Sequence, residues 1–315
     1  MKLNQIFAAA TFLGFLAAVS PALAQGADNA SAQTVITAVG KGNENPAPLR
    51  QQDLQVQVGG KTTPATDLVP LRGDRAGLEL VVLIDGSART SLGTQLGEIE
   101  RFVNSLPPTT SVGIAYMQNG RAVFSQPLTA DKAQALKALR LPAGPAGSSA
   151  SPYFCLSDLA KHWPSNNREN RREVVMITDG VDPYNLRFDP ENPYVQGAIT
   201  DSIRAGLVVD SIYWHDQGGY DRGAYQNNAG ESLLGQVSQV TGGKAYWQGI
   251  GNPVSFAPFF DDLNRRLQNQ YELGFDVPAK PRPEIVSLKV KVNEPDVKVD
   301  APQRVLVAPG GVARQ

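Results

Sequence analysis

The chain has 315 residues, of which 42% are apolar and 19% charged, which is enough for one large domain or for a domain with a small module. Lysine and arginine (29) nearly balance aspartate and glutamate (30), so no basic surplus exists to neutralise phosphates, and we expect no nucleic-acid partner. One cysteine and two histidines argue against an internal disulfide and a structural zinc site. Any metal would therefore be held mainly by oxygen.

Residues 1–24 have the pattern of a signal peptide. Lys2 gives a positively charged start, residues 6–19 are a short apolar run, and Ala22-Leu23-Ala24 places small residues before a cleavage point at Gln25. No later segment reaches the roughly 18 apolar residues that a membrane span needs. We therefore expect an exported mature chain, periplasmic or secreted, without a membrane span.

Both ends of the mature chain carry strand patterns. Residues 25–33 are small and polar, which is typical of a flexible leader. Apolar and polar residues alternate over 54–58 and again over 286–292, as in antiparallel strands with one wet face. Such strands are not stable singly, so we expect the two terminal segments to pack together as one small antiparallel β module. The predicted division is a signal peptide 1–24, a leader 25–33, an N-terminal β segment 34–77, a central domain 78–276, a C-terminal β segment 277–310 and a tail 311–315.

Between the β segments, buried strands alternate with amphipathic helices. Residues 78–84, 174–178 and 207–213 are nearly continuous apolar runs, as expected of strands covered on both faces. Other elements are predicted at 112–117 and 122–125 (strands) and at 92–106, 131–139, 151–162, 196–205, 231–240 and 256–268 (helices). This alternation predicts an α/β fold with a doubly wound, mainly parallel, Rossmann-like sheet flanked by helices.

Two of the buried strands end in aspartate. Residues 78–84 lead into Asp85-Gly86-Ser87-Ala88-Arg89, and residues 174–178 lead into Asp179-Gly180-Val181-Asp182. Ligands of doubly wound sheets bind where the strands end, so neighbouring strands would place Asp85 and Asp179 in one crevice. Each Asp-Gly pair taken singly is also common turn chemistry.

Taken together, these motifs resemble the von Willebrand factor A (vWA, integrin I-like) domain, where they form part of a metal-ion-dependent adhesion site. Residues 240–246 (VTGGKAY) and 270–275 (QYELGF) are similar to a secreted bacterial branch of that family, the VWFA-related proteins known from acidobacteria. In that branch, flanking β segments accompany the vWA domain. The resemblance covers nearly the whole mature chain and implies a vWA-like fold.

The resemblance also implies a set of site residues. The family uses a DxSxS triplet, a threonine or serine from a middle loop, and an aspartate after the next central strand. The matching positions here are Asp85, Ser87, either Ser149 or Ser151, and Asp179. Arg89 stands where the triplet has its last serine, and arginine offers no lone pair to a cation. The predicted adhesion site is therefore partly degenerate.

Two carboxylates in one crevice need a positive charge between them. In one interpretation, Mg²⁺ or another divalent cation provides this positive charge and is bound by carboxylate, hydroxyl and water oxygens. The other makes Arg89 a built-in counter-ion, in which case no cofactor is needed.

The same edge of the sheet should carry a partner-binding rim. Asp182 and His215 follow two of the buried strands, and residues 216–228 form a long polar stretch that contains Tyr220 and Tyr225. Tyrosine gives a large contact area at low entropic cost, which favours both as contact residues. A solvated irregular loop is the alternative interpretation.

We expect an exported, non-enzymatic vWA-domain binding protein that recognises a protein partner through the degenerate adhesion site and the 216–228 loop. One alternative is a structural envelope scaffold with an inactive site. The other is an exported hydrolase, against which stands the lack of a Gly-x-Ser-x-Gly elbow, a phosphate-binding loop and a His-Glu-x-x-His pair. The sequence names neither the partner nor the oligomeric state.

Overall fold

The computed structural model describes residues 29–42, 44–86, 88, 90–142, 151–215, 223–249 and 251–308. The predicted signal peptide 1–24 and the tail 311–315 lie outside these residues. Among the helices that are described, none combines the length and the apolar character needed to cross a membrane.

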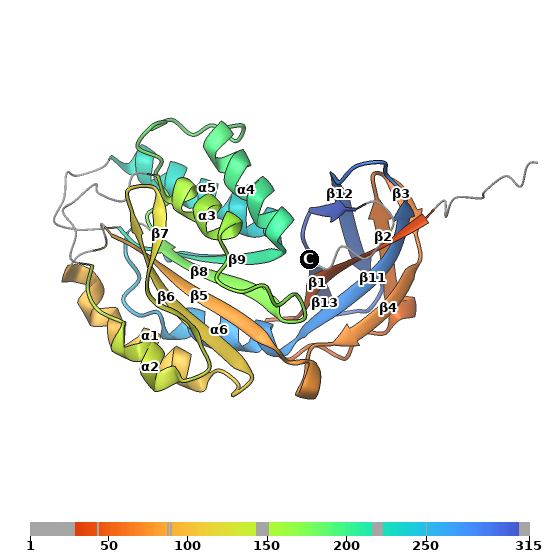
Figure 1. Ribbon diagram of the computed structural model, residues 1–315, viewed down its shortest axis with the longest axis horizontal. Coiled ribbons are helices and arrows are strands. Elements are labelled where there is room, and N and C mark those ends of the chain that lie inside the picture. The colour runs from red at the N-terminus through yellow and green to blue at the C-terminus, as the bar shows by residue number, and fades with distance from the viewer. Residues whose placement is uncertain are drawn as a thin grey trace, which may run out of the picture.

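An α/β unit lies beside a unit built of strands (Figure 1). The α/β unit has one six-stranded sheet in the order β10-β9-β8-β5-β6-β7. Its strands are β5 (Leu78–Asp85), β6 (Thr110–Gln118), β7 (Arg121–Thr129), β8 (Arg171–Thr178), β9 (Leu207–Tyr213) and β10 (Ala245–Tyr246). All neighbouring strands are parallel except the edge strand β7, which is antiparallel to β6. The predicted mainly parallel, doubly wound sheet is confirmed.

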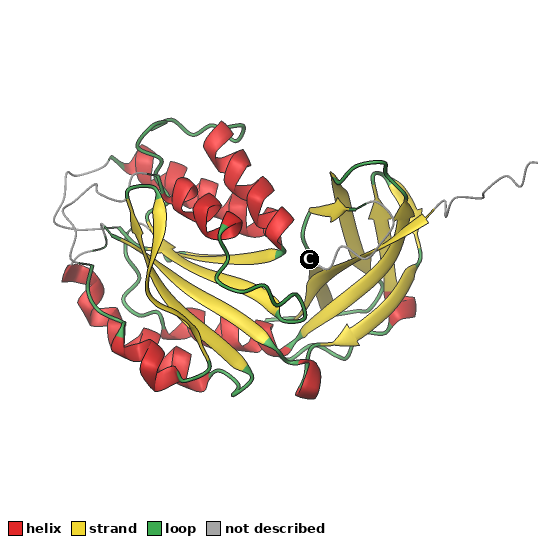
Figure 2. Cartoon of the chain, viewed as in Figure 1, coloured by secondary structure: helices red, strands yellow, loops and turns green. Residues whose placement is uncertain are grey.

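Helices cover both faces of this sheet (Figure 2). One face carries α3 (Pro152–Lys161), α4 (Pro193–Ala205) and α5 (Ala224–Thr241), and the other carries α1 (Leu96–Ser105), α2 (Lys132–Lys137) and α6 (Ala257–Gln268). Along β5, Val81 and Leu83 pack under the first group, while Val82 and Ile84 pack under the second. Because both faces are buried, the strand has to be apolar at every position. The short 3-10 helices are η1 (Gln51–Asp53), η2 (Gly73–Arg75) and η3 (Thr90–Gln95).

The second unit is a sandwich of two antiparallel sheets. The first sheet has the order β13-β1-β11-β4 and the second has the order β14-β12-β2-β3. The strands are β1 (Asn29–Gly40), β2 (Leu54–Val58), β3 (Lys61–Thr63), β4 (Ala65–Pro70), β11 (Gln270–Pro278), β12 (Glu284–Val292), β13 (Val297–Asp300) and β14 (Arg304–Val307). Ile36, Val56, Leu273 and Val305 meet in one core between the sheets. The N- and C-terminal segments thus form one antiparallel β unit, as predicted.

Two boundaries differ from the predicted ones. Strand β1 begins at Asn29, so residues 29–33 are paired with β11 and do not form a flexible leader. Ala30 and Ala32 lie in the predicted leader, but their small side chains are part of the core of the sandwich and are 4% and 0% exposed. Strand β11 pairs with β1 and β4 and therefore belongs to the sandwich, although its sequence was expected inside the central domain.

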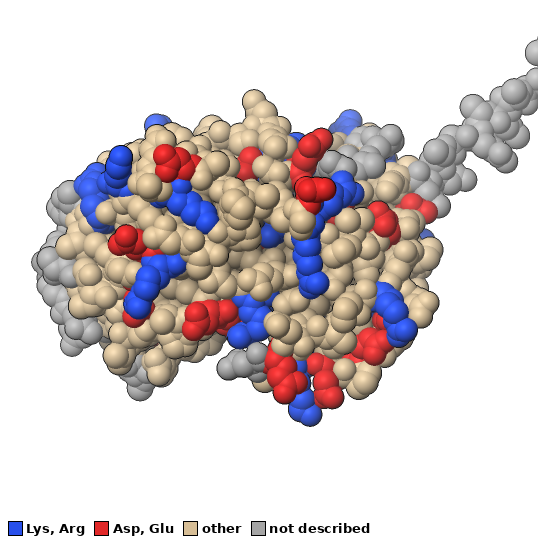
Figure 3. Space-filling view, turned by 90° about the horizontal axis from the view of Figure 1, so that it is seen from below, with Lys and Arg blue, Asp and Glu red and all other residues tan. Residues whose placement is uncertain are grey.

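The surface charges are mixed. On the face shown in Figure 3, lysine and arginine side chains lie among aspartate and glutamate side chains, with no large field of one sign. This distribution agrees with the near balance of charges in the sequence.

Candidate functional site

The strand order of the central sheet reverses between β5 and β8. From β5 the chain continues to β6 on one side and later returns to β8 on the other side. In doubly wound sheets this switch point is where ligands bind, at the carboxyl ends of the strands. Asp85 is the last residue of β5, and Asp179 directly follows β8. Because Ile84 and Ile177 are direct partners in these paired strands, the two predicted aspartates lie at adjacent strand ends.

Asp85 is tied to the end of β8. Its carboxylate is 3% exposed and accepts a hydrogen bond from the Thr178 hydroxyl, with 2.7 Å between Oγ1 and Oδ2. The Thr178 hydroxyl oxygen accepts in turn from the Gly180 N–H at 3.3 Å. Thr178 was not among the predicted site residues. Its position directly before the Asp-Gly pair was the available signal.

The turn after β8 is clamped between helices. Asp179 is 8% exposed, and its Oδ1 accepts a hydrogen bond from the Val181 N–H at 2.9 Å. Gly180 has a φ of +66°, and a Cβ at this position would lie 2.5 Å from Cγ of Leu234 in α5. Its carbonyl accepts from the Tyr153 hydroxyl of α3 at 2.6 Å. Only glycine fits this turn, which fixes the place of Asp179.

Ser151 begins α3 beside this turn. It is fully buried, and its hydroxyl oxygen caps the helix by accepting from the Tyr153 N–H at 3.3 Å. Ser151 is thus the N-cap of α3 and Pro152 stands in the first turn, which agrees with the helix predicted from residue 151. Burial, with the charges of Asp179 and Asp182 added, raises the pKa of Tyr153 well above its usual value. The Tyr153 hydroxyl therefore stays a neutral donor to the turn.

Asp182 differs from its predicted place on an exposed rim. It is 1% exposed, and its two carboxylate oxygens accept from the Tyr184 N–H at 3.1 Å and from the Asn192 side-chain amide at 3.0 Å. The carboxylate is thus used inside the loop that joins β8 to α4. An aspartate that bonds the N–H two residues further on is ordinary turn chemistry, and here it orders the loop.

His215 follows β9 and is fixed through its backbone. Its N–H donates to Asn252 Oδ1, and Asn252 Nδ2 donates to its carbonyl, both at 2.7 Å. Helix α5 begins at Ala224, well before the predicted start, so residues 224–228 are helical and are not part of a loop. Asn227 and Asn228 have low helix propensity, and Gly230, further along the same helix, lies close to the Asp179 carbonyl. Tyr225 lies in the first turn of this helix and is 61% exposed.

The structure describes part of the predicted metal site. Ser87, Arg89 and Ser149, together with Tyr220 of the predicted rim, lie outside the described residues. The described candidates Asp85, Asp179 and Ser151 offer oxygen atoms, the donor type that Mg²⁺ prefers. Each of these side chains also accepts a hydrogen bond from the protein itself. Within the described ranges, no three histidine, cysteine, aspartate or glutamate side chains come together as a metal cluster.

Aromatic side chains gather beside the Asp179 turn. The ring of Phe154 in α3 lies 5.4 Å from the Tyr184 ring and 4.7 Å from the Tyr194 ring, measured between centroids. The Phe188 N–H donates to the Tyr225 hydroxyl at 3.2 Å. Tyr184, Phe188, Tyr194 and Tyr225 are 62%, 44%, 41% and 61% exposed. We call these five residues the aromatic rim.

Of the residues in this rim, only Tyr225 was predicted as a site residue. Three of its members fall within residues 184–194, directly after the Asp179-Gly180 turn, and this density of aromatic residues was the missed signal. Single exposed apolar residues need no explanation, whereas neighbouring exposed rings such as Tyr184 and Tyr194 make this surface a candidate site.

Known proteins resemble this chain only in structure. No protein family matches its sequence, and no curated protein does either. It is similar to an aerotolerance-related membrane protein from Bacteroides fragilis NCTC 9343 (16% identity, TM-score 0.45, 61% of this chain and 98% of that chain). It is similar to BatB from Bacteroides thetaiotaomicron (14%, 0.43, 61% and 97%) and to the SpRpn10 VWA domain (14%, 0.39, 59% and 92%).

The α/β unit is vWA-like in fold. Its own strand order and the aspartates at the switch point carry this assignment. The three likenesses, with TM-scores from 0.39 to 0.45, add no argument about activity or partners.

Proposed function

We propose that this vWA-like chain is an exported, non-enzymatic binding protein that recognises a protein partner at the carboxyl edge of its central sheet. The aromatic rim is the observation that carries the proposal. Tyrosine and phenylalanine are enriched at protein interfaces, and a few large anchors supply most of the binding energy there. Four such rings are exposed on the loop after β8 and on the starts of α4 and α5. The Tyr184 and Tyr194 rings are in contact, and the Tyr225 hydroxyl bonds the Phe188 backbone.

The rim is held in place before any partner arrives. Asn192 donates to Asp182 and accepts from the Tyr194 N–H at 2.9 Å, so one amide closes the loop and caps α4. The rings of Phe154, Tyr184 and Tyr194 also support one another. Side chains that are already ordered lose little entropy on binding, which favours affinity.

We further propose that recognition does not depend on a metal. The sequence places Arg89 where a metal-competent triplet has serine, and its guanidinium would neutralise Asp85 and Asp179 as a fixed counter-ion. The described carboxylates already accept hydrogen bonds from Thr178 and Val181, which supports a site kept together by protein donors. Arg89 would then bind an acidic group of the partner by a charge-assisted hydrogen bond.

The position of His162 argues against a role for this residue in hydrolysis at the switch point, whereas His215 follows β9 at the same edge of the sheet. Helix α3 starts beside Gly180 and runs away from the switch point to His162, a distance of roughly 15 Å for ten helical residues. His162 is exposed and contacts Asp158 of its own helix. A general base must lie within hydrogen-bond reach of the reacting group, and His162 does not lie within reach of Asp85 or Asp179.

Photo-crosslinking tests the proposed surface. Benzoylphenylalanine would replace Tyr225 in one variant and Val254 in the matched control. Val254 is 90% exposed and lies beside η3 on the same edge of the sheet but outside the rim, so it tests whether the rim itself makes the contact. In intact cells of the source organism, we expect position 225 to crosslink to one envelope protein and position 254 not to do so. Absence of a product from position 225, or identical products from both positions, would contradict the proposal.

Export is tested separately. We expect the chain recovered from the periplasm or the medium to begin at Gln25, as read by N-terminal sequencing. An intact Met1 on the recovered chain would contradict cleavage.

A further inference from the structure

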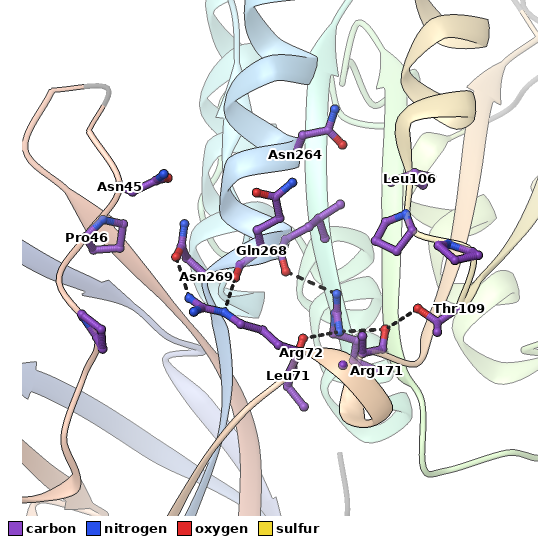
Figure 4. A pocket seen from close by; sticks show the side chains of 16 residues that line it. Asn45, Pro46, Leu71, Arg72, Leu106, Thr109, Arg171, Asn264, Gln268 and Asn269 are labelled. Carbon is purple, nitrogen blue, oxygen red and sulfur yellow. Dashed lines mark hydrogen bonds between the residues drawn. The ribbon is translucent and has the colours of Figure 1, made fainter.

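A pocket of about 640 Å³ lies between the α/β unit and the sandwich, at the end of the central sheet opposite the aromatic rim (Figure 4). Its walls come from the segments 45–48, 71–76, 106–109 and 264–269 and from Arg171 at the start of β8. This volume is typical of small-molecule sites, which occur preferentially between domains.

Two arginines are the only charged residues among those that line the pocket, Arg72 and Arg171. Neither forms an ion pair with a carboxylate of the described chain, since their side-chain hydrogen bonds end on carbonyl and amide oxygens. Other buried arginines behave differently. Arg172 lies beside Glu79, and Arg266 beside Asp300.

The oxygens that the two arginines contact belong largely to the end of α6. Arg72 donates to the Gln268 carbonyl and to Asn269 Oδ1, both at 2.9 Å, and Arg171 donates to the Leu267 carbonyl at 3.3 Å. A helix C-terminus carries the equivalent of about half a negative charge. The negative end of α6 therefore balances only part of one positive charge. The two arginines leave the pocket with a net excess of more than one positive charge.

Burial makes the charge of Arg171 costly, whereas Arg72 is exposed. Arg171 is 6% exposed, and within the described structure its Nε has no hydrogen-bond acceptor. The carboxyl group that interacts electrostatically with Arg171 is that of Glu173. Burial and the charge of Asp210 raise the pKa of Glu173 well above its usual value. Glu173 therefore keeps its proton to higher pH and neutralises Arg171 poorly.

We propose that this pocket binds a small organic anion. Its carboxylate or phosphate group lies against the guanidinium groups of Arg72 and Arg171, and its apolar body lies against Leu106, Leu267 and the prolines of the lining. Arg72 uses two of its five N–H groups for α6 and keeps the others for the ligand. The pocket lies at the other end of the sheet from the aromatic rim, so this site does not depend on the proposed partner.

Calorimetric titration of the mature chain 25–315 tests the ligand class. The probes are 4-phenylbutyrate and 4-phenylbutyl phosphate, with the neutral 4-phenylbutanol as control. We expect saturable binding of one molecule of at least one anion, with the alcohol at least about tenfold weaker. The two anions distinguish a carboxylate from a phosphate ligand.

Matched variants locate the site. Arg72→Gln removes a guanidinium from an exposed position in the pocket, and Arg75→Gln removes an equal charge from η2, outside the lining. We expect Arg72→Gln to weaken binding at least about tenfold and Arg75→Gln to change it by less than about twofold. Lack of saturable binding by both anions, equal binding of the alcohol, or equal effects of the two variants would overturn the proposal.

Discussion

The two ends of the central sheet bury opposite charges in different ways. Strand β8 begins with Arg171 and Arg172, and it ends at Thr178, directly before Asp179. At the amino end the buried cations meet backbone carbonyls and Glu79, and the sandwich lies against this end (Figure 1). At the carboxyl end, the buried Asp85 carboxylate accepts from the Thr178 hydroxyl of the neighbouring strand, and Asp179 accepts from the Val181 N–H of its own turn.

This difference shows how one strand serves two purposes. The sandwich covers the amino end, so the positively charged side chains there lie at the junction of the two units and beside the pocket. The carboxyl end is covered only by its own loops and helix starts, which turn aromatic side chains outward. We therefore expect stability to depend most on the amino end and recognition to depend on the carboxyl end.

The largest expected effect tests the amino end. Glu79→Ala removes the partner of Arg172, 3.7 Å away, and the acceptor of the Trp163 indole N–H at 2.7 Å. Burial lowers the pKa of Arg172 only to about 10, so it stays charged and loses its counter-charge. The free energy of unfolding in urea at pH 7 should fall by about 3–5 kcal/mol.

The control for this variant is Glu284→Ala, which removes one member of the exposed pair Lys280–Glu284. It should change the free energy of unfolding by less than about 1 kcal/mol. Similar small losses in both variants would show that the buried pair is not a stabilising feature of the amino end.

A second variant tests how rigid the carboxyl end is. Gly180→Ala places a Cβ 2.5 Å from Leu234 Cγ in a residue with positive φ and should lower the free energy of unfolding by about 2–4 kcal/mol. Gly197→Ala in α4 meets no atom within 4 Å and should be neutral or stabilising by up to about 1 kcal/mol. If Gly180→Ala were as mild, the turn that positions Asp179 would be looser than described.

The pH dependence of stability distinguishes the ends further. Burial raises the pKa of Glu173 well above its usual value of 4.5, and burial raises the pKa of Asp210 as well. The folded state therefore holds a proton that the unfolded state releases. Binding of this proton contributes fully to the free energy of unfolding below about pH 4.5. The contribution is lost as the pH rises toward the pKa of Glu173 in the folded state, by at most about 1.4 kcal/mol per pH unit.

Glu173→Gln keeps a neutral side chain at every pH. Unfolding measured at pH 5 and at pH 8 should show a variant that gains stability over the native chain as the pH rises. Equal differences between variant and native chain at both pH values would contradict a raised pKa at this position.

The smallest expected effect is a null result at the carboxyl end. After treatment with a chelator, titration of Mg²⁺ or Mn²⁺ into the mature chain should give no saturable heat, because Arg89 takes the place of a cation in the proposal. Saturable binding that Asp179→Ala abolishes would establish a working metal site instead.

The buried strands were predictable because burial on both faces requires an almost continuous run of apolar residues in the sequence. The runs at 78–84, 174–178 and 207–213 are apolar at nearly every position, and all three are confirmed as buried strands. The starts of β1 and α5 were not predictable from local composition. Ala32 is buried by a sheet far along the chain, and Gly230 is held by the close approach of the Asp179 carbonyl.

The candidate site was predictable only in its skeleton. Asp85 and Asp179 follow buried strands, so adjacent parallel strands bring them together. The aromatic rim combines α3, the loop after β8, and the starts of α4 and α5, and the pocket combines segments from both units. Such surfaces arise from contacts between distant segments, which a periodicity along the sequence does not encode.

The most direct measurement is the affinity for the protein that crosslinks from position 225. It would be compared by interferometry between the double variant Tyr184→Ser with Phe188→Ser and the control Val254→Ser, all at exposed positions. The account predicts binding at least about tenfold weaker for the double variant and a change below about twofold for the control. Equal affinities would contradict the assignment of the aromatic rim as the recognition surface.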